Sequence, residues 1–257
     1  MEQQGHELKG LHAAVTGGGS GIGAAVARRL VVAGARVSLL GRKLDKLQGQ
    51  AAALAPLGQI DVCQVDVADE TSVKAAFAQI GRVDILINNA GQVESAPLTR
   101  TSLALWQAML NVNLTGTFLC SREVVGGMSE RGFGRIINVA STAALTGYAY
   151  VAAYCAAKHG VLGLTRAMAL EFAKKGVTIN AVCPGYTETD IVAQALDKIA
   201  DKTGRSLDEA RAALVAANPQ GRLVQPQEVA DTVLWLAQRG SGALTGQAIA
   251  VCGGELM

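Results

Sequence analysis

The sequence has few aromatic and few charged side chains, and neither sign of charge dominates. Aromatic residues make up 4% and charged residues 17% of the 257 positions, and 23 basic against 21 acidic residues leave a net charge of +2. Nucleic acids and anionic membranes are bound by basic surfaces, and unpaired bases stack on aromatic rings. The composition therefore gives no reason to expect a nucleic acid or a membrane as a partner.

Cysteine pairs at the spacing of a metal site or a redox motif are also missing. The five cysteines are widely spaced, without a C-x-x-C pair: Cys63, Cys120, Cys155, Cys183 and Cys252. We interpret them as small hydrophobic residues in a reducing compartment, and we expect neither a disulfide framework nor a bound metal. The N-terminal residues, MEQQGHELKG, lack the apolar core of a secretory signal. Both observations lead us to expect a cytoplasmic protein.

Half of the residues are hydrophobic, but no long run is free of polar side chains. The uncharged segments 101–121 and 136–157 both contain Asn, Thr and Gly, so neither resembles a membrane-spanning helix. We expect them to be buried inside one domain formed by residues 1–257, because a chain of this composition easily builds a large core.

Glycine is concentrated in one segment near the N-terminus. A short apolar run, Leu11–Val15, is followed by TGGGSGIG at residues 16–23 and by a helical composition over Ala24–Ala33. Glycines let the backbone approach an anion closely, and the N-terminus of a helix directs free N–H groups at it. The order strand, glycine turn and helix therefore predicts a phosphate site, in preference to a glycine-rich loop without a ligand.

The end of the next predicted strand indicates which dinucleotide binds. Ala35–Leu40 is followed by Gly41, Arg42 and Lys43, without a carboxylate. In dinucleotide-binding folds an acidic residue at this place binds the ribose hydroxyls of NAD, whereas an arginine accommodates the 2′-phosphate of NADP. We therefore expect NADP, although both cations could instead be surface residues at the start of a helix.

Apolar strands alternate with helical segments along the rest of the chain. We expect strands at 60–65, 83–87, 135–140, 177–182 and 248–251, and helices at 44–57, 69–80, 151–172 and 227–238. This alternation predicts βαβ units and a parallel sheet covered on both faces. The carboxyl ends of such strands line the ligand crevice, where Arg42, Asp66 and Asn88 would meet.

Tyr154 and Lys158 lie four residues apart in a predicted helix, with Ser141 thirteen residues before the tyrosine. Residues at i and i+4 share one helix face, so the ammonium group would stand beside the phenol and lower its pKa. A tyrosine with a lowered pKa can exchange a proton with an alcohol or alkoxide, and Ser141 could hydrogen-bond the same oxygen. Taken alone, such a pair more often lies on a solvated helix face.

Asn113 falls in the middle of a predicted long helix, Thr101–Glu123. Asparagine is unfavourable inside a helix, so this position needs an explanation. Either the amide satisfies a neighbouring helix, or it marks a bent turn that orders water near the site.

These features together resemble the classical subfamily of the short-chain dehydrogenases/reductases, with similarity to 3-oxoacyl-thioester ketoreductases, and the match covers essentially the whole chain. The motifs that carry the resemblance are the glycine motif 16–23, the turn 88–91 (NNAG), Asn113 within NVNLTG, Ser141, the pair Tyr154 and Lys158, and the dipeptide Pro184-Gly185. The resemblance implies a single-domain Rossmann-type α/β fold with a doubly wound parallel sheet of about seven strands and helices on both faces.

The resemblance also implies roles for the residues of these motifs. Tyr154 would be the general acid/base, and Ser141 would hold the substrate oxygen. Lys158 would lower the tyrosine pKa and bind the nicotinamide ribose, and Asn113 would anchor a water that relays protons to Lys158. The nicotinamide carries out the hydride chemistry, and no metal is required.

The same resemblance implies the contacts of the cofactor and the substrate. The cofactor would be bound by Gly17, Gly19, Ser20, Gly21, Ile22, Gly23, Arg42, Asp66, Val67, Asn89, Ala90, Gly91, Tyr154, Lys158, Pro184, Gly185, Thr187 and Thr189. The substrate would contact Ser141, Tyr148, Tyr154 and Tyr186. A homotetramer, or a homodimer, would form through the two long helices that flank the site.

We therefore predict an oxidoreductase that transfers a hydride between NADP(H) and a ketone or secondary alcohol. The pocket candidates Gln92, Ala143, Tyr148 and Tyr186 carry no fixed charge. This suits a 3-oxoacyl thioester on CoA or an acyl carrier, and equally an alicyclic or aromatic ketone. The segment 187–220, with predicted helices at 191–201 and 207–217, would cover the substrate as a lid. The alternative is a catalytically silent NADP-binding redox sensor or scaffold, which the intact Asn-Ser-Tyr-Lys set disfavours.

Overall fold

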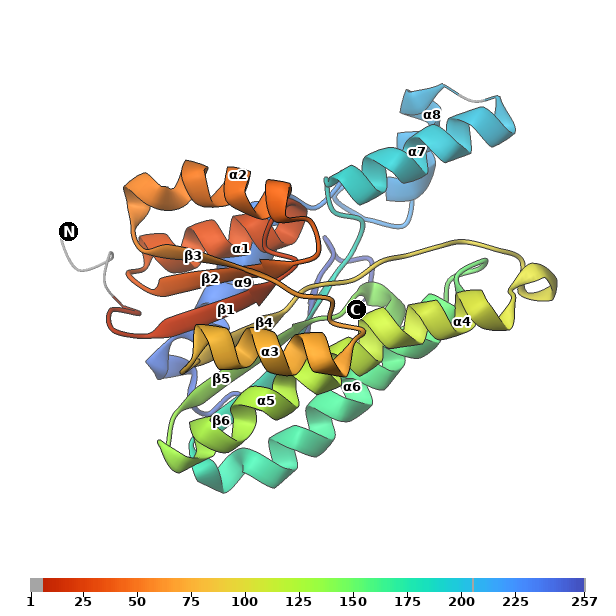
Figure 1. Ribbon diagram of the computed structural model, residues 1–257. Coiled ribbons are helices and arrows are strands. Elements are labelled where there is room, and N and C mark those ends of the chain that lie inside the picture. Colours follow the sequence, from red (N-terminus) through yellow and green to blue (C-terminus); the bar gives the residue numbers. More distant parts are fainter. Residues whose placement is uncertain (1–6, 205, 257) are drawn as a thin grey trace.

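The computed structural model describes residues 7–204 and 206–256, and its centre is a parallel sheet. The strands lie in the order β3-β2-β1-β4-β5-β6-β7 (Figure 1). Their bounds are β1 His12–Thr16, β2 Arg36–Gly41, β3 Ile60–Gln64, β4 Ile85–Asn88, β5 Gly134–Val139, β6 Val177–Pro184 and β7 Ala248–Val251. The order reverses between β1 and β4, which defines the doubly wound fold and places the ligand crevice at their carboxyl ends.

Helices cover both faces of the sheet (Figure 1). One face packs against α1, α2 and α9, and the other packs against α3, α5 and α6. The bounds of these helices are α1 Gly21–Val32, α2 Leu44–Leu54, α3 Glu70–Ile80, α5 Gly116–Glu130, α6 Ala152–Phe172 and α9 Pro226–Ala237. The predicted fold class is therefore confirmed.

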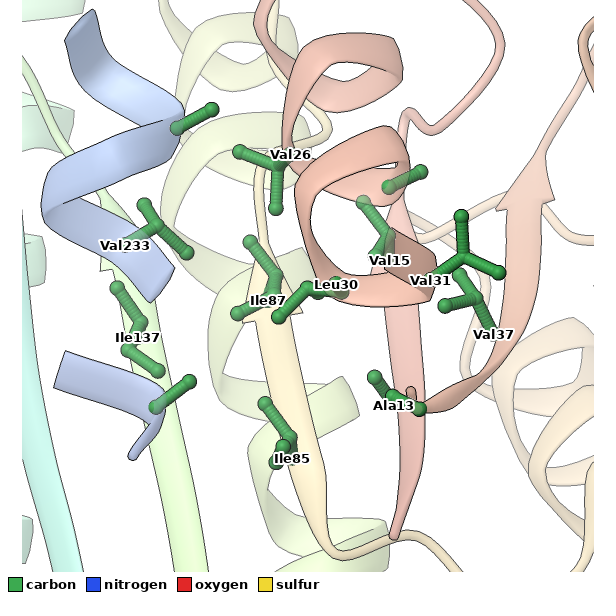
Figure 2. Packing of buried hydrophobic residues seen from close by; sticks show 14 of the residues in the cluster. Ala13, Val15, Val26, Leu30, Val31, Val37, Ile85, Ile87, Ile137 and Val233 are labelled. Atoms are coloured by element: carbon green, nitrogen blue, oxygen red, sulfur yellow. The ribbon is translucent and has the colours of Figure 1, made fainter. Parts of the chain in front are cut away.

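The alternation of side chains along the strands builds the two cores. Val15 and Ile87 point to the side of α1 and α9, whereas Ala14 and Leu86 point to the other side. Figure 2 shows Val15 and Ile87 meeting helix side chains such as Leu30 of α1. All of these residues are fully buried, and burial of a large aliphatic side chain contributes about 1.5–3 kcal/mol. This packing fixes the N-terminus of α1 at the carboxyl edge of the sheet.

The predicted helix over 101–123 has a different form in the structure. Helix α4 runs from Leu103 to Leu110, a π-helical turn follows at Asn111–Thr115, and α5 continues to Glu130. In the π turn, the carbonyl of Asn113 accepts a hydrogen bond from the Thr117 hydroxyl at 2.9 Å. The bent turn that Asn113 suggested is therefore present, and π turns often occur at functional sites.

The segment between β6 and α9 forms two helices that stand away from the sheet (Figure 1). They are α7, Asp190–Thr203, and α8, Leu207–Val215, and a capping box between Ser206 and Glu209 opens α8. The Glu188 carboxylate accepts hydrogen bonds from Arg211 of α8 at 2.8 Å and from Gln225 at 2.9 Å. Within the described ranges, no helix is both long and apolar enough to span a bilayer.

His12 is buried at the start of β1, far from the carboxyl edge. Its Nδ1 donates to the carbonyl of Arg82, so the neutral ring accepts a hydrogen bond from the Ser38 hydroxyl at Nε2, with a distance of 2.8 Å. Burial lowers the pKa of His12 below its usual value. Protonation at Nε2 would remove the acceptor that Ser38 needs.

We expect this histidine to make folding sensitive to acid. Its folded-state pKa lies below the unfolded value near 6.5, so the unfolded chain binds the proton more tightly. The contribution of His12 is fully present above pH ~6.5 and is lost as the pH falls below that value. Urea unfolding should show a lower free energy of unfolding at pH 5.5 than at pH 7.5, and His12→Gln should make this difference smaller. Substitution of the exposed His159, as His159→Gln, should leave the difference between the two pH values unchanged. An equal difference in both variants would refute the assignment to His12.

Candidate active site

The glycine segment 16–23 forms a narrow loop in which side chains do not fit. A β-carbon on Gly23 would lie 2.2 Å from the carbonyl oxygen of Gly17. Gly17 and Gly21 have φ angles of +66° and +52°, which glycine adopts without strain. The Asn89 amide donates to the carbonyls of Thr16 and Gly17, at 3.0 and 3.2 Å. The loop is thus clamped to the end of β4.

Thr16 completes this clamp from the other side. Its hydroxyl oxygen accepts the backbone N–H groups of Asn89 at 2.9 Å and Ala90 at 3.0 Å, and it donates to the carbonyl of Ile87. These contacts hold the turn after β4 against the turn after β1. The neighbouring Asn88 points elsewhere, because its amide bonds Ser121 and Asn138 inside the protein.

The loop presents the N-terminus of α1 to the crevice. Ser20 occupies the N-cap position, is exposed, and makes no capping hydrogen bond. The first N–H groups of a helix have no acceptor within it, so those of Gly21, Ile22 and Gly23 are available to an anion. Thr189 closes the opposite wall, since a β-carbon on Gly21 would lie 3.2 Å from its methyl group. The loop therefore fits a pyrophosphate.

The ends of β2 and β3 supply the neighbouring groups. Arg42 is exposed, and its carbonyl accepts a hydrogen bond from Gln64 at 2.9 Å, which fixes the backbone at the end of β2. The Asp66 carboxylate caps the following turn by accepting the N–H of Ala68 at 3.0 Å. Val67 is buried against Gly116 at the start of α5. Arg42 and Asp66 follow the ends of β2 and β3 on the same edge as the glycine loop, as predicted, whereas the Asn88 amide points into the protein.

Ser141, Tyr154 and Lys158 are brought together where β5 ends and α6 begins. The Ser141 hydroxyl lies near enough to the Tyr154 phenol to lower its pKa, and it accepts the N–H of Ala143 at 3.1 Å. Lys158 is buried, and its ammonium lies 5.6 Å from the centroid of the Tyr154 ring. The ammonium donates to the carbonyl of Val139 at 3.0 Å. Spacing in the sequence had predicted this grouping.

The pKa of Tyr154 differs from the expectation. Burial raises it to about 12, and the hydrogen bond from Ser141 only partly opposes this effect. Burial also lowers the pKa of Lys158 to about 8. In the protein alone, burial of the phenol therefore sets the direction of the shift, and the net change in the pKa of Tyr154 is upward.

Asn113 faces the turn after β4 from the π turn. Its amide donates to the carbonyls of Gln92 at 2.9 Å and Met109 at 3.0 Å, and its Oδ1 accepts the N–H of Gln92. A β-carbon on Gly91 would lie 2.8 Å from this oxygen and 3.8 Å from the Lys158 ammonium. The Asn113 oxygen and the Lys158 ammonium thus both approach Gly91 at the position that a β-carbon would occupy.

The segment after β6 forms the far wall of the crevice. The hydroxyl of buried Thr187 donates to the carbonyl of Gly185 at 2.9 Å, and that of Thr189 donates to the carbonyl of Thr187 at 3.2 Å. Gly185 is held by its N–H bond to Val251 of β7. Pro184, at the end of β6, brings this wall to the same edge.

The substrate side contains a charge that sequence reasoning missed. Tyr148 and Tyr186, both predicted to contact the substrate, make an edge-to-face contact with ring centroids 6.4 Å apart. Between them and Gly185 lies the Glu255 carboxylate, which accepts a hydrogen bond from the Tyr148 hydroxyl. The expectation of a pocket without fixed charge is therefore wrong. Glu255 follows the last strand, whose carboxyl end points into the crevice. Its position after a strand is the feature of the sequence that could have identified it as a site residue.

The fold and this constellation define a class of oxidoreductases, and comparison with known proteins identifies it. The short chain dehydrogenase family matches residues 11–200, and the chain belongs to this family. A Streptomyces coelicolor protein with the provisional name ketoacyl reductase is 41% identical, over 94% of this chain and 95% of that relative. Cis-4-hydroxycyclohexanecarboxylate dehydrogenase of Sinomonas cyclohexanicum is 40% identical, over 94% and 95%.

A solved structure shows the same likeness in three dimensions. The crystal structure of a variant of actinorhodin polyketide ketoreductase with NADPH is 40% identical. It superimposes with a TM-score of 0.90 and covers 98% of both chains. The family predicted from the motifs is thus confirmed.

The glycine loop provides a test of the phosphate site. Gly23→Ala would place a methyl group against the Gly17 carbonyl and the Asn89 amide, at 2.2 and 2.5 Å. We expect the loop to shift and the dissociation constant for NADPH to rise about tenfold or more, measured by cofactor fluorescence. Gly49→Ala, in an open position on α2, should leave binding unchanged and stabilise the protein by about 0.5–1 kcal/mol. Wild-type affinity in Gly23→Ala would contradict the assignment.

Proposed function

We propose that this protein catalyses hydride transfer between NADP(H) and a ketone or its secondary alcohol. The observation that carries the proposal is the grouping of Ser141, Tyr154 and Lys158 beside a glycine loop that fits a pyrophosphate. Bound NADPH would supply the hydride to the carbonyl carbon. The chain's own residues provide the proton and position the carbonyl.

Tyr154 is the proton donor in this proposal. Its pKa of about 12 keeps the phenol protonated at neutral pH, so it can donate to the oxygen that becomes negative during reduction. Ser141 lies beside the phenol and would hold the same substrate oxygen. The geometry therefore favours the acid role of Tyr154, and the reverse reaction requires removal of its proton.

Lys158 and Asn113 supply the path by which Tyr154 recovers its proton. A pKa of about 8 lets Lys158 exchange protons near neutral pH. Its contact with the Val139 carbonyl fixes the ammonium between Tyr154 and Gly91. We propose that Lys158 also binds the nicotinamide ribose, and that the π turn of Asn113 orders a water leading to it.

The cofactor contacts follow the edge of the sheet. We propose that the helix α1 N-terminus binds the pyrophosphate, that Asp66 and Val67 meet the adenine, and that the turn 89–91 lines the cofactor. Thr187 and Thr189 would orient the carboxamide beside Pro184 and Gly185. Exposed Arg42 would bind the 2′-phosphate, and the likeness to a ketoreductase solved with NADPH supports this preference.

Two substrate classes suit the proposed chemistry. One is a 3-oxoacyl thioester on CoA or an acyl carrier, supported by the relative named a ketoacyl reductase. The other is an alicyclic or aromatic ketone, supported by the relative named for a hydroxycyclohexane carboxylate. A silent NADP-binding sensor or scaffold would not need the proton-transfer group Ser141, Tyr154 and Lys158, which this chain retains.

The surface supports two further proposals. Residues 187–220 would act as a lid within the single domain, because α7 and α8 stand away from the sheet (Figure 1). Thr189, the N-cap residue of α7, lies beside the glycine loop. The exposed side chains of Phe118 on α5 and Leu170 on α6, at 41% and 84%, support a homotetramer or homodimer formed by these helices.

The free thiols support a cytoplasmic location.

Removing the phenolic hydroxyl tests the proton donor. We expect Tyr154→Phe to lower kcat for ketone reduction about 10²–10⁴-fold, because general acid catalysis contributes that much. NADPH binding, followed by fluorescence, should stay nearly unchanged. Tyr150→Phe changes an exposed tyrosine of the same segment and should keep the wild-type rate. If Tyr154→Phe retained most of its activity, the mechanism would fail.

The cofactor preference is tested at the end of β2. We expect Arg42→Ala to lower kcat/KM for NADPH about 10–100-fold by removing a charge-assisted phosphate contact, and to leave NADH unaffected. Arg28→Ala, on the exposed face of α1, serves as the matched control. A wild-type enzyme that uses NADH better than NADPH would overturn the argument from Arg42.

A further inference from the structure

The chain end returns to the substrate pocket through a double-glycine turn. Gly253 and Gly254 have φ angles of +64° and +89°. A β-carbon on Gly253 would lie 2.2 Å from the Asn218 amide oxygen, and one on Gly254 would lie 3.3 Å from Pro219. The turn therefore packs tightly under the segment that follows α8. It places the partly buried Glu255 carboxylate beside Tyr148 and Gly185.

One oxygen of Glu255 is fixed and the other is open. Oε1 accepts the hydroxyl proton of Tyr148, whose oxygen also lies 2.9 Å from the Thr142 hydroxyl. A hydroxyl has one proton, so Thr142 donates to Tyr148 and Tyr148 donates to Glu255. Oε2 would lie 3.1 Å from a β-carbon on Gly185. Within the described chain, no hydrogen bond to Oε2 is found.

This carboxylate is connected to the reacting end of the pocket. Thr142 follows Ser141, which hydrogen-bonds Tyr154. The Tyr186 ring contacts Tyr148, and burial, followed by the charge of Glu255, raises the pKa of Tyr186. The pocket thus has a proton donor at one end, an aromatic wall, and a fixed anion at the other end.

We propose that Glu255 is a specificity-determining residue, which rejects ketones with an anionic remote end and accepts those with a neutral or hydrogen-bond-donating one. The inference rests on the proposed ketone reduction and narrows its substrate class. The remote end of the substrate, whether an acyl chain or a ring substituent, would meet Oε2.

Two physical effects act in the same direction. A second carboxylate near Oε2 would be repelled by the like charge of Glu255, and the rings of Tyr148 and Tyr186 displace part of the water that would screen this repulsion. A hydroxyl or ammonium group would instead donate to Oε2, forming a charge-assisted hydrogen bond. The Tyr148 contact prevents the carboxylate from turning away, so the discrimination is built into the resting protein.

The test compares wild type with Glu255→Gln, which keeps the shape and removes the charge. The probes are 4-oxocyclohexanecarboxylate, 4-hydroxycyclohexanone and 4-methylcyclohexanone, with NADPH as the reductant. The measure is kcat/KM, or the inhibition constant against acetoacetyl-CoA for any probe that is not reduced. Glu171→Gln, an exposed carboxylate on α6, is the matched control.

We expect Glu255→Gln to raise kcat/KM for 4-oxocyclohexanecarboxylate about tenfold or more relative to kcat/KM for 4-methylcyclohexanone. The same variant should lower kcat/KM for 4-hydroxycyclohexanone relative to that of the methyl probe. Glu171→Gln should reproduce the wild-type ratios. Unchanged ratios in Glu255→Gln, in a variant that binds NADPH normally, would overturn the role of Glu255. Failure of the wild type to reduce acetoacetyl-CoA and every ring ketone would instead refute the proposed function. Tyr148→Phe provides an independent check, because the released carboxylate should discriminate less.

Discussion

The parallel sheet is buried on both faces, and this constraint determines where every functional group lies. Each strand needs a helical crossover to return to its starting edge, so all loops that follow strands collect at one edge. The glycine loop, Arg42, Asp66, the turn 89–91, Ser141 and the segment 184–189 all follow strands in this way. The topology of the sheet therefore brings residues that are far apart in the sequence into one crevice.

Within this crevice, the close contacts between backbone segments are as important as the chemistry of the side chains. Gly17 and Gly23 nearly touch, and Asn89 and Thr16 join their loop to the turn after β4. This clamp connects the phosphate end of the crevice to Gly91, which Asn113 and Lys158 both approach closely. The proposed cofactor site and the proposed proton path therefore share one rigid support.

Local patterns in the sequence predicted the strands, the flanking helices and the grouping of Ser141, Tyr154 and Lys158, because each depends on periodicity or on spacing along one element. The pKa of Tyr154 could not be predicted in this way, since it is set by burial beneath segments distant in the sequence. Glu255 was missed for a related reason: its role depends on a turn packed against Asn218 and on the position of Tyr148. The unfavourable placement of Asn113 inside a helix indicated a bend as one of two alternatives, and a π turn could not be distinguished from other bends.

The π turn at Asn111–Thr115 has a geometric consequence for the whole rod formed by α4 and α5. A π turn contains about one residue more than an α turn, which rotates everything after it by roughly 100° about the helix axis. The stripe of side chains that α4 presents is thus out of phase with that of α5. One continuous rod can line the mouth of the crevice at its start, cover the sheet with Leu119 and Val124, and still leave Phe118 exposed. The inserted residue therefore lets α4 and α5 direct their side chains toward different parts of the protein.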